Sequence, residues 1–207
     1  LLHRIPGLSE RFIYFNDDMF LIKKTNKEDW YEEGGAPVLR GKWSKSYNKI
    51  WYKKAASLFF PFFKKRPSYN LAQSMSANMA GYNNTYYRSF HSGRPLLKSV
   101  LEEYFKKNPQ TLRNQLKYRF RNQDQFMPYS LGWHLMIKEG GAALTTSLGL
   151  EEIGNIKKMP LGKFKILLNK ADQNPKTFSL NIQDLNLGKK SIQDYFKNWM
   201  NDLLGVV

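Results

Sequence analysis

The chain of 207 residues contains no cysteine, and this absence excludes disulfides and thiolate metal sites and fits a reducing compartment. It has no uninterrupted apolar run of about eighteen residues, so we expect no transmembrane helix. A Gly-rich phosphate loop, a Cys/His metal-ligand spacing and a Gly-x-Ser-x-Gly element are also missing. Nucleotide binding would therefore have to use other groups.

Acidic residues are scarce, and they are absent between Gly34 and Leu101. That window holds twelve of the basic residues, and the whole chain has a formal net charge of +16. Such a field concentrates anionic partners, among them nucleotide-sugars, phosphate-bearing glycans, anionic lipid and nucleic acid. Charge alone does not choose between them.

What the chain does contain is enough apolar sequence for a folded protein, with 42% hydrophobic and 15% aromatic residues. Strands and helices alternate along it, which predicts an α/β fold with a core sheet flanked by helices. The expected strands are 12–15, 19–22, 37–39, 164–168 and 177–182. The expected helices are a short one ending at Glu33, then 69–87, a helix opened by Pro95 and stopped at Asn108-Pro109, 123–138, and 191–204.

Residues 41–68 change character, because aromatic side chains are bracketed there by lysines. We interpret this segment as a helical, basic-aromatic insertion. Two interpretations stay open for its apolar residues. They pack into the core while the lysines face water, or they meet an anionic membrane interface.

Asn16, Asp17 and Asp18 follow the apolar run Phe12 to Phe15 directly. We expect that run to be a strand buried on both faces, and ligand sites gather at the carboxyl ends of such strands. Adjacent carboxylates can hold a hard divalent cation together with substrate phosphates. The same three residues also make a good turn, so the spacing leaves both interpretations open.

His91 lies between Arg88 and Arg94, just before the helix that we expect Pro95 to open. A helix N-terminus and two arginines favour a phosphate, and a histidine there can be a general base toward a hydroxyl. A solvent-exposed loop histidine is the alternative. His134, inside the helix expected over 123–138, is better explained as a core histidine.

Arg121 and Asp124 form a second candidate pair. A guanidinium can bind phosphate through two hydrogen bonds, and Arg119 is the competing choice for this role. Asp124 could orient the arginine, bind the metal, or cap a helix starting near Gln125.

The stretch HRIPGLSERFIYFNDDMFL, residues 3–21, closely resembles the second conserved region of the Stealth family. These are bacterial capsular polysaccharide phosphotransferases, distantly related to the animal lysosomal-enzyme N-acetylglucosamine-1-phosphotransferase. His91 with the Leu-Lys-Ser-Val-Leu-Glu-Glu run at 97–103, and Arg121 with Asp124, resemble the third region. Asn181 resembles the fourth, where the family has Asn-Asp. Here the acid arrives only at Asp184, so the register at this position stays open.

The resemblance implies transfer of a sugar-1-phosphate unit from a nucleotide-sugar, commonly a UDP-sugar, to a glycan hydroxyl in capsule synthesis, with release of nucleoside monophosphate. It implies Mg²⁺ or Mn²⁺ at Asp17 and Asp18, and catalytic roles for Asp18, His91, Arg121 and Asp124. Donor binding is expected from Asn16, Arg88, Arg94, Arg119 and Asn181.

The family's first region and the usual C-terminal ending are not found in the 207 residues, so we expect residues 1–207 to be a fragment of one catalytic domain. The expected location is the cytoplasm, at the inner face of the cell membrane. Two alternatives remain. One is a basic module that binds nucleic acid or membrane without catalysis, and the other is a glycosyltransferase that releases nucleoside diphosphate.

Overall fold

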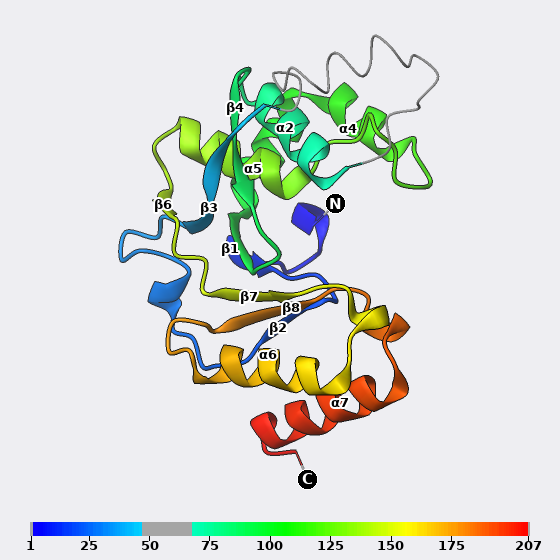
Figure 1. The fold of residues 1–207 in the computed structure, drawn as a ribbon. Coiled ribbons are helices and arrows are strands. Elements are labelled where there is room, and N and C mark those ends of the chain that lie inside the picture. Colours follow the sequence, from blue (N-terminus) through cyan, green and yellow to red (C-terminus); the bar gives the residue numbers. More distant parts are fainter. Residues whose placement is uncertain (1, 47–67, 207) are drawn as a thin grey trace. The chain divides into compact units, whose positions relative to one another are not determined.

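A computed structural model describes residues 2–46 and 68–206, and the fold is α/β as predicted (Figure 1). The chain divides into two compact units, each built from segments that are distant in sequence. Unit 1 comprises residues 1–14, 28–89 and 94–146, and unit 2 comprises residues 15–27, 90–93 and 147–207.

Unit 2 is a three-stranded sheet covered on one side by two helices (Figure 1). The strands lie in the order β2 (Met19–Leu21), β8 (Ser179–Ile182) and β7 (Leu150–Ile153), with β8 antiparallel to β2 and parallel to β7. The helices are α6 (Leu161–Gln173) and α7 (Lys190–Leu204). Two 3-10 turns, η4 (Ile156–Lys158) and η5 (Leu185–Leu187), connect these elements.

The two faces of this sheet differ in chemistry because side chains alternate along each strand. Leu180, Ile182 and Ile153 point to the helices and are buried with Phe164 and Phe196. Asn181 and Glu152 are paired in register, so they share the opposite face. One face therefore forms the apolar core of unit 2. The other, called the polar face below, carries Ser179, Asn181 and Glu152 beside the apolar Met19, Leu21 and Leu150.

Unit 1 contains two small sheets. β1 (Arg11–Tyr14) pairs antiparallel with β5 (Arg94–Leu97). β3 (Val38–Lys45) pairs antiparallel with β4 (Thr85–Ser89) and parallel with β6 (Ala143–Thr145). The helical elements are η1 (Leu2–Arg4), α2 (Tyr69–Met79), α3 (Lys98–Lys107), α4 (Pro109–Leu116) and α5 (Pro128–Lys138). The turn η2 (Lys27–Asp29) has its first residue in unit 2 and the other two in unit 1.

Helix α5 carries the core of unit 1, with Leu131 and Trp133 fully buried. His134 is buried too, as predicted. Its Nε2 accepts the Tyr87 N–H at 2.9 Å, and its Nδ1 lies 2.6 Å from the Ser130 carbonyl oxygen, to which it can only donate. Burial lowers the pKa of His134 to about 4, so the ring is neutral in the folded protein.

Several sequence predictions are confirmed. The acidic turn separates two strands, 177–182 contains β8, and 191–204 matches α7. The helix before Asn108 ends at Lys107, and α5 ends ahead of Gly140. These elements have strong local signals, either a clear amphipathic period or a Gly or Pro boundary.

Other predictions are wrong. Pro95 does not open a helix. It lies in β5, in a two-stranded sheet where its missing N–H is tolerated, and the helix begins at Lys98. The helix expected through Tyr87 ends at Met79, because Gly81 takes a left-handed φ of 101° and Thr85–Ser89 pairs with β3. The strand expected at 164–168 is part of α6, whose buried residues recur at helical spacing.

Further predictions are corrected by the structure. β1 is antiparallel to its partner and half-buried rather than covered on both faces. In place of a helix ending at Glu33 there is only the turn η2. The helix expected from Gln123 begins at Pro128. The helical, basic-aromatic insertion expected over 41–68 is wrong at its start, because residues 41–45 belong to strand β3, and it falls largely on residues 47–67, outside the described residues. Within the described ranges, no helix is long and apolar enough to cross a bilayer.

Candidate active site

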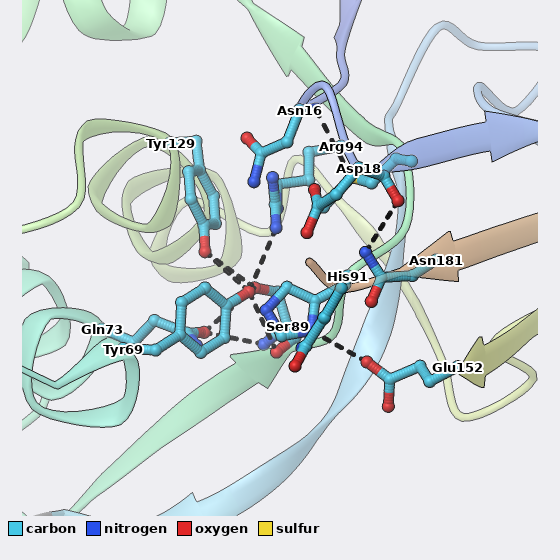
Figure 2. A network of polar contacts seen from close by, with 12 residues as sticks. Asn16, Asp18, Tyr69, Gln73, Ser89, His91, Arg94, Tyr129, Glu152 and Asn181 are labelled. Carbon is cyan, nitrogen blue, oxygen red and sulfur yellow. Dashed lines mark hydrogen bonds and ion pairs between the residues drawn. The ribbon is translucent and has the colours of Figure 1, made fainter. Parts of the chain in front are cut away.

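Three of the predicted site residues, Asp18, His91 and Asn181, lie around the polar face of the unit 2 sheet (Figure 2). Asp18 immediately precedes β2, and Asn181 lies on β8 opposite Met19. The Asn181 side-chain amide donates to the Asp18 carbonyl oxygen at 2.9 Å, and the Ile182 N–H donates to the same oxygen at 3.0 Å. The backbone of the acidic turn is therefore fixed against β8 by two hydrogen bonds.

The turn itself closes through the Met19 N–H, which donates to the Asn16 carbonyl oxygen at 3.2 Å. It presents its two carboxylates differently, since Asp17 is exposed and Asp18 is half-buried. Oδ1 of Asp18 and Oδ1 of Asn181 are buried, and neither has a hydrogen-bond partner among the described residues. Buried acceptors of this kind need a donor or a cation.

A divalent metal fits this chemistry, because Mg²⁺ and Mn²⁺ prefer hard oxygen ligands and need only one or two protein carboxylates when substrate phosphates complete the shell. The buried Oδ1 of Asp18 is the observation that favours such an ion. Within the described residues there is no cluster of three or more His, Cys, Asp or Glu side chains. The carboxylates that could hold such an ion in this turn are those of Asp17 and Asp18.

His91 belongs to unit 2, in the segment 90–93 between β4 and β5. Its Nδ1 lies 2.8 Å from Oε1 of Glu152 on β7 and 3.4 Å from Nε2 of Gln183 (Figure 2). Strand β5, and not a helix, follows it, so the helix N-terminus expected beside His91 is wrong. Glu152 was missed by sequence reasoning, since only the register of β7 on β8 brings it to the face that carries Asn181.

Arg94 belongs to unit 1 and is fully buried. Its Nη2 donates to the Tyr69 hydroxyl at 3.1 Å, and its guanidinium carbon lies 4.2 Å from the centre of the Tyr129 ring and 5.5 Å from that of Tyr14. Burial opposes the charge on Arg94, but the phenolic oxygens of Tyr129 and Tyr69 leave its pKa above the ordinary value. Stacking on aromatic rings is a geometry that suits a guanidinium.

The hydroxyl groups around Arg94 continue into a network (Figure 2). Tyr129 donates to Tyr69 at 2.9 Å, and the Ser89 hydroxyl lies 2.9 Å from Tyr69 and 3.1 Å from Tyr129. Gln73 accepts the Ser89 N–H at 2.8 Å. Burial raises the pKa of Tyr129 well above the ordinary value, although Arg94 lowers it. This network was not visible in the sequence, since its members come from β4, β5, α2 and α5.

The other predicted arginines also lie in unit 1. Arg88 is half-buried on β4 opposite Lys42, whereas Arg119 and Arg121 are exposed in the segment between α4 and α5. Arg119 lies over the Phe120 ring at 5.4 Å. Arg121 lines a cavity of about 100 Å³, whose described lining also includes Gln115, Gln123, Gln125, Tyr69 and Phe126.

Asp124 is exposed, and its Oδ2 accepts a hydrogen bond from the Tyr118 hydroxyl at 3.4 Å. It does not cap a helix, because α5 begins four residues later and has no side-chain cap. Asp184, the alternative to Asn181, is exposed in a left-handed conformation just before η5. The hydrogen bond to Asp18 belongs to Asn181, which favours that residue for the fourth-region role.

No family model matches the chain. Among curated proteins it is similar to a capsular polysaccharide phosphotransferase of Haemophilus influenzae, with 28% identity over 96% of this chain and 52% of the relative. A capsular polysaccharide phosphotransferase of Actinobacillus suis is 29% identical over 94% of the chain and 50% of its own length. An exopolysaccharide phosphotransferase of Lactiplantibacillus plantarum is 58% identical over 33 residues, 16% of the chain and 10% of the relative. The chain spans about half the length of the relatives that it matches over most of its sequence.

Proposed function

We propose that this chain forms part of a Stealth-type phosphotransferase that moves a sugar-1-phosphate unit from a nucleotide-sugar to a glycan hydroxyl. Two findings support the proposal. Relatives named capsular polysaccharide phosphotransferase align with nearly the whole chain. Asp18, His91 and Asn181, which carry the family resemblance, fall in one unit around one polar sheet face.

The observation that carries the proposal is the buried, unpartnered Oδ1 of Asp18, held in place by the bonds from β8 to its carbonyl group. We propose that Asp17 and Asp18 hold Mg²⁺ or Mn²⁺ on the diphosphate of the donor, with Asn16 and Asn181 as donor-binding neighbours. When bound, such an ion neutralises phosphate charge and makes the nucleoside monophosphate a better leaving group.

The remaining groups match the needs of phosphoryl transfer, which are mainly positioning and charge neutralisation. We propose that His91 accepts the proton of the acceptor hydroxyl. Arg121 neutralises developing negative charge, and Asp124 orients it. The basic side chains of Arg88, Arg94 and Arg119 add to the positive field for an anionic donor. The proposed donor is a UDP-sugar, and the proposed acceptor is a capsule glycan at the inner face of the cell membrane.

The test uses the full-length protein that carries this chain. It is incubated with a panel of nucleotide-sugars, Mg²⁺ or Mn²⁺ and capsule oligosaccharide, and the products are followed by ³¹P NMR and anion-exchange chromatography. We expect nucleoside monophosphate together with a new phosphodiester signal on the glycan. The yield should fall to background when the metal is chelated.

Release of nucleoside diphosphate would contradict the proposal and indicate a glycosyltransferase. Steeply salt-dependent binding of oligonucleotides or anionic vesicles, without turnover of any donor and without a metal requirement, would favour a basic binding module instead. The products therefore separate the three functions in one experiment.

A further inference from the structure

Glu152 contacts His91 directly, with 2.8 Å between Oε1 of the carboxylate and Nδ1 of the ring. The side chain of His91 is 24% exposed and that of Glu152 is 42% exposed. Ion pairs as exposed as this one contribute little to stability, typically about 0–1 kcal/mol. The contact is therefore better explained by what it does to the imidazole than by what it adds to folding.

The carboxylate fixes which ring nitrogen carries the proton. An ionised carboxylate can only accept, so Nδ1 of His91 must be the donor, and in the neutral ring Nε2 keeps the lone pair. Gln183 lies near the same nitrogen, with its Nε2 at 3.4 Å. If the carboxylate were lost, that amide could donate to Nδ1 and move the ring proton to Nε2. Glu152 thus disfavours the tautomer protonated on Nε2, which has no lone pair at that nitrogen and cannot accept a proton there.

The sheet determines where Glu152 points. β7 pairs with β8 so that Glu152 faces Asn181, on the polar side of the sheet, whereas Glu151 pairs with Leu180 on the helix-covered side. Glu151 instead forms an ion pair with Lys170 of α6 at 2.9 Å. Two adjacent glutamates on one strand therefore have different environments, and only Glu152 contacts His91.

We infer that Glu152 is a positioning residue for His91, an inference that rests on the proposed function. Nε2 of His91 takes the proton of the acceptor hydroxyl as its oxygen attacks the phosphorus that carries the sugar. The new P–O ester bond forms, and the bond from that phosphorus to the bridging oxygen breaks. The electron pair of the broken bond leaves with the nucleoside monophosphate. Glu152 stabilises the resulting imidazolium, which then loses its proton to solvent.

The kinetic test compares Glu152→Gln with Glu151→Gln in the full-length protein. General-base catalysis contributes about 10²–10⁴-fold, so we expect E152Q to lower kcat by about 100-fold or more with little change in the KM for the donor. E151Q, the matched control on the other face of the same strand, should stay within about twofold of the wild type. Thermal unfolding of both variants should remain close to that of the wild type.

A double-mutant cycle separates positioning from a general structural effect. If Glu152 acts through His91, E152Q has no further effect on the rate that remains in a His91→Ala background. An equal loss in both backgrounds, or an E152Q rate equal to that of E151Q, would overturn the inference while the activity of the wild type still supports the proposed function.

A second measurement needs no turnover. The imidazole nitrogens of His91 are assigned by ¹⁵N NMR of the full-length protein, by comparison with His91→Ala. In the neutral form of the wild type, His91 should carry its proton on Nδ1, and Glu152→Ala should shift the proton toward Nε2. A wild-type His91 protonated on Nε2, or a tautomer unchanged by E152A, would contradict the inference. This readout decides the role of Glu152 even if the wild type releases no nucleoside monophosphate, in which case the proposed function fails separately.

Discussion

Two polar clusters, the Tyr69–Tyr129–Ser89 group of unit 1 and the Asp18–Asn181 pair of unit 2, differ in the hydrogen bonds that they form. In unit 1, Tyr69, Tyr129 and Ser89 bond to one another, and Arg94 is packed against their rings. In unit 2, Asn181 uses its amide nitrogen to hold the Asp18 backbone, and the Oδ1 atoms of both residues have no partner among the described residues. The unit 1 groups bond mainly to one another and so contribute to the fold, although Nε2 of Gln73 in this network has no hydrogen-bond partner among the described residues. The unpartnered Oδ1 atoms of Asp18 and Asn181 are buried acceptors, and such acceptors suit a ligand site when they lie together.

The comparison leads to a simple expectation. Substitutions in the unit 2 cluster should reduce chemistry and leave folding nearly unchanged. Substitutions in the unit 1 network should reduce stability first.

The largest effect is expected for Asp18→Asn. The amide keeps the shape of the side chain but removes the charge that we propose holds the metal, and the loss of a charge-stabilising group of this kind costs about 3–4 kcal/mol in the transition state. Turnover should therefore fall by about 10²–10³-fold with an unchanged melting temperature.

Asp184→Asn is the matched control, since Asp184 is exposed on the same unit and Asn tolerates its left-handed backbone. It should leave turnover unchanged. If D184N lost as much activity as D18N, the fourth-region role would belong to Asp184 and not to Asn181.

Arg94→Ala tests the expectation that substitutions in the unit 1 network reduce the stability of the fold. The change removes a fully buried side chain, its stacking on Tyr129 and a donor to Tyr69. We expect the free energy of unfolding to fall by about 2–5 kcal/mol, as for other large-to-small core changes. Chemical denaturation monitored by tryptophan fluorescence measures it.

Arg113→Ala, on the exposed face of α4, is the control and should change the free energy of unfolding by less than about 0.5 kcal/mol. Arg94→Lys should recover only part of the loss because an ammonium lacks the planar face of a guanidinium. An R94A protein as stable as R113A would show that the unit 1 network does not stabilise the fold.

The predicted core histidine supplies a pH test. The pKa of His134 is lowered to about 4 in the folded protein from its ordinary 6.5, because the neutral ring is buried. Between pH 4 and pH 6.5 the unfolded chain therefore binds more protons than the folded protein. The contribution of His134 to the free energy of unfolding is fully present above pH 6.5 and is lost as the pH falls toward 4. The full loss from this group is about 3 kcal/mol.

The contribution of His134 is isolated by comparing the wild type with His134→Gln, whose carbonyl oxygen can still accept the Tyr87 N–H. The difference between the two unfolding free energies should change with pH only over this window. A difference independent of pH would mean that His134 is not held neutral by burial.

The smallest effect is expected for Lys190→Ala. Lys190 pairs with Asp194 at 2.9 Å within α7, and its side chain is 82% exposed. Such pairs contribute about 0.3–0.5 kcal/mol and lose part of that in salt. Turnover should not change. A large loss of activity would contradict the expectation that the exposed pair on α7 takes no part in the chemistry.

How much the sequence could predict depends on how local each signal is. The strand–turn–strand around Asp18 and helix α7 have clear local patterns, and both were predicted. The segment 164–168 was misassigned because a short apolar run suits a strand as well as a helix, until Leu168 and Ala171 extend the helical spacing of Phe164. Pro95 was misassigned because the pairing of β5 with β1 is not encoded near it.

The residues of the candidate site also differ in how far local sequence predicts them. Asp18, His91 and Asn181 were found through a family resemblance, since each lies in a distinctive stretch of sequence. Glu152 was missed because the pair Glu151-Glu152 has no distinctive sequence pattern, and its contact with His91 depends on the register between β7 and β8. Residue chemistry was visible in the sequence, and contacts between distant segments were not.

The most direct measurement is a Mn²⁺ titration of the full-length protein by electron paramagnetic resonance, in the presence of UDP-sugar. We predict stoichiometric binding by the wild type and by D184N, and loss of that binding in a folded D18N protein. Equal Mn²⁺ binding by all three proteins would contradict the assignment of the acidic turn in unit 2 as the metal site for phosphoryl transfer.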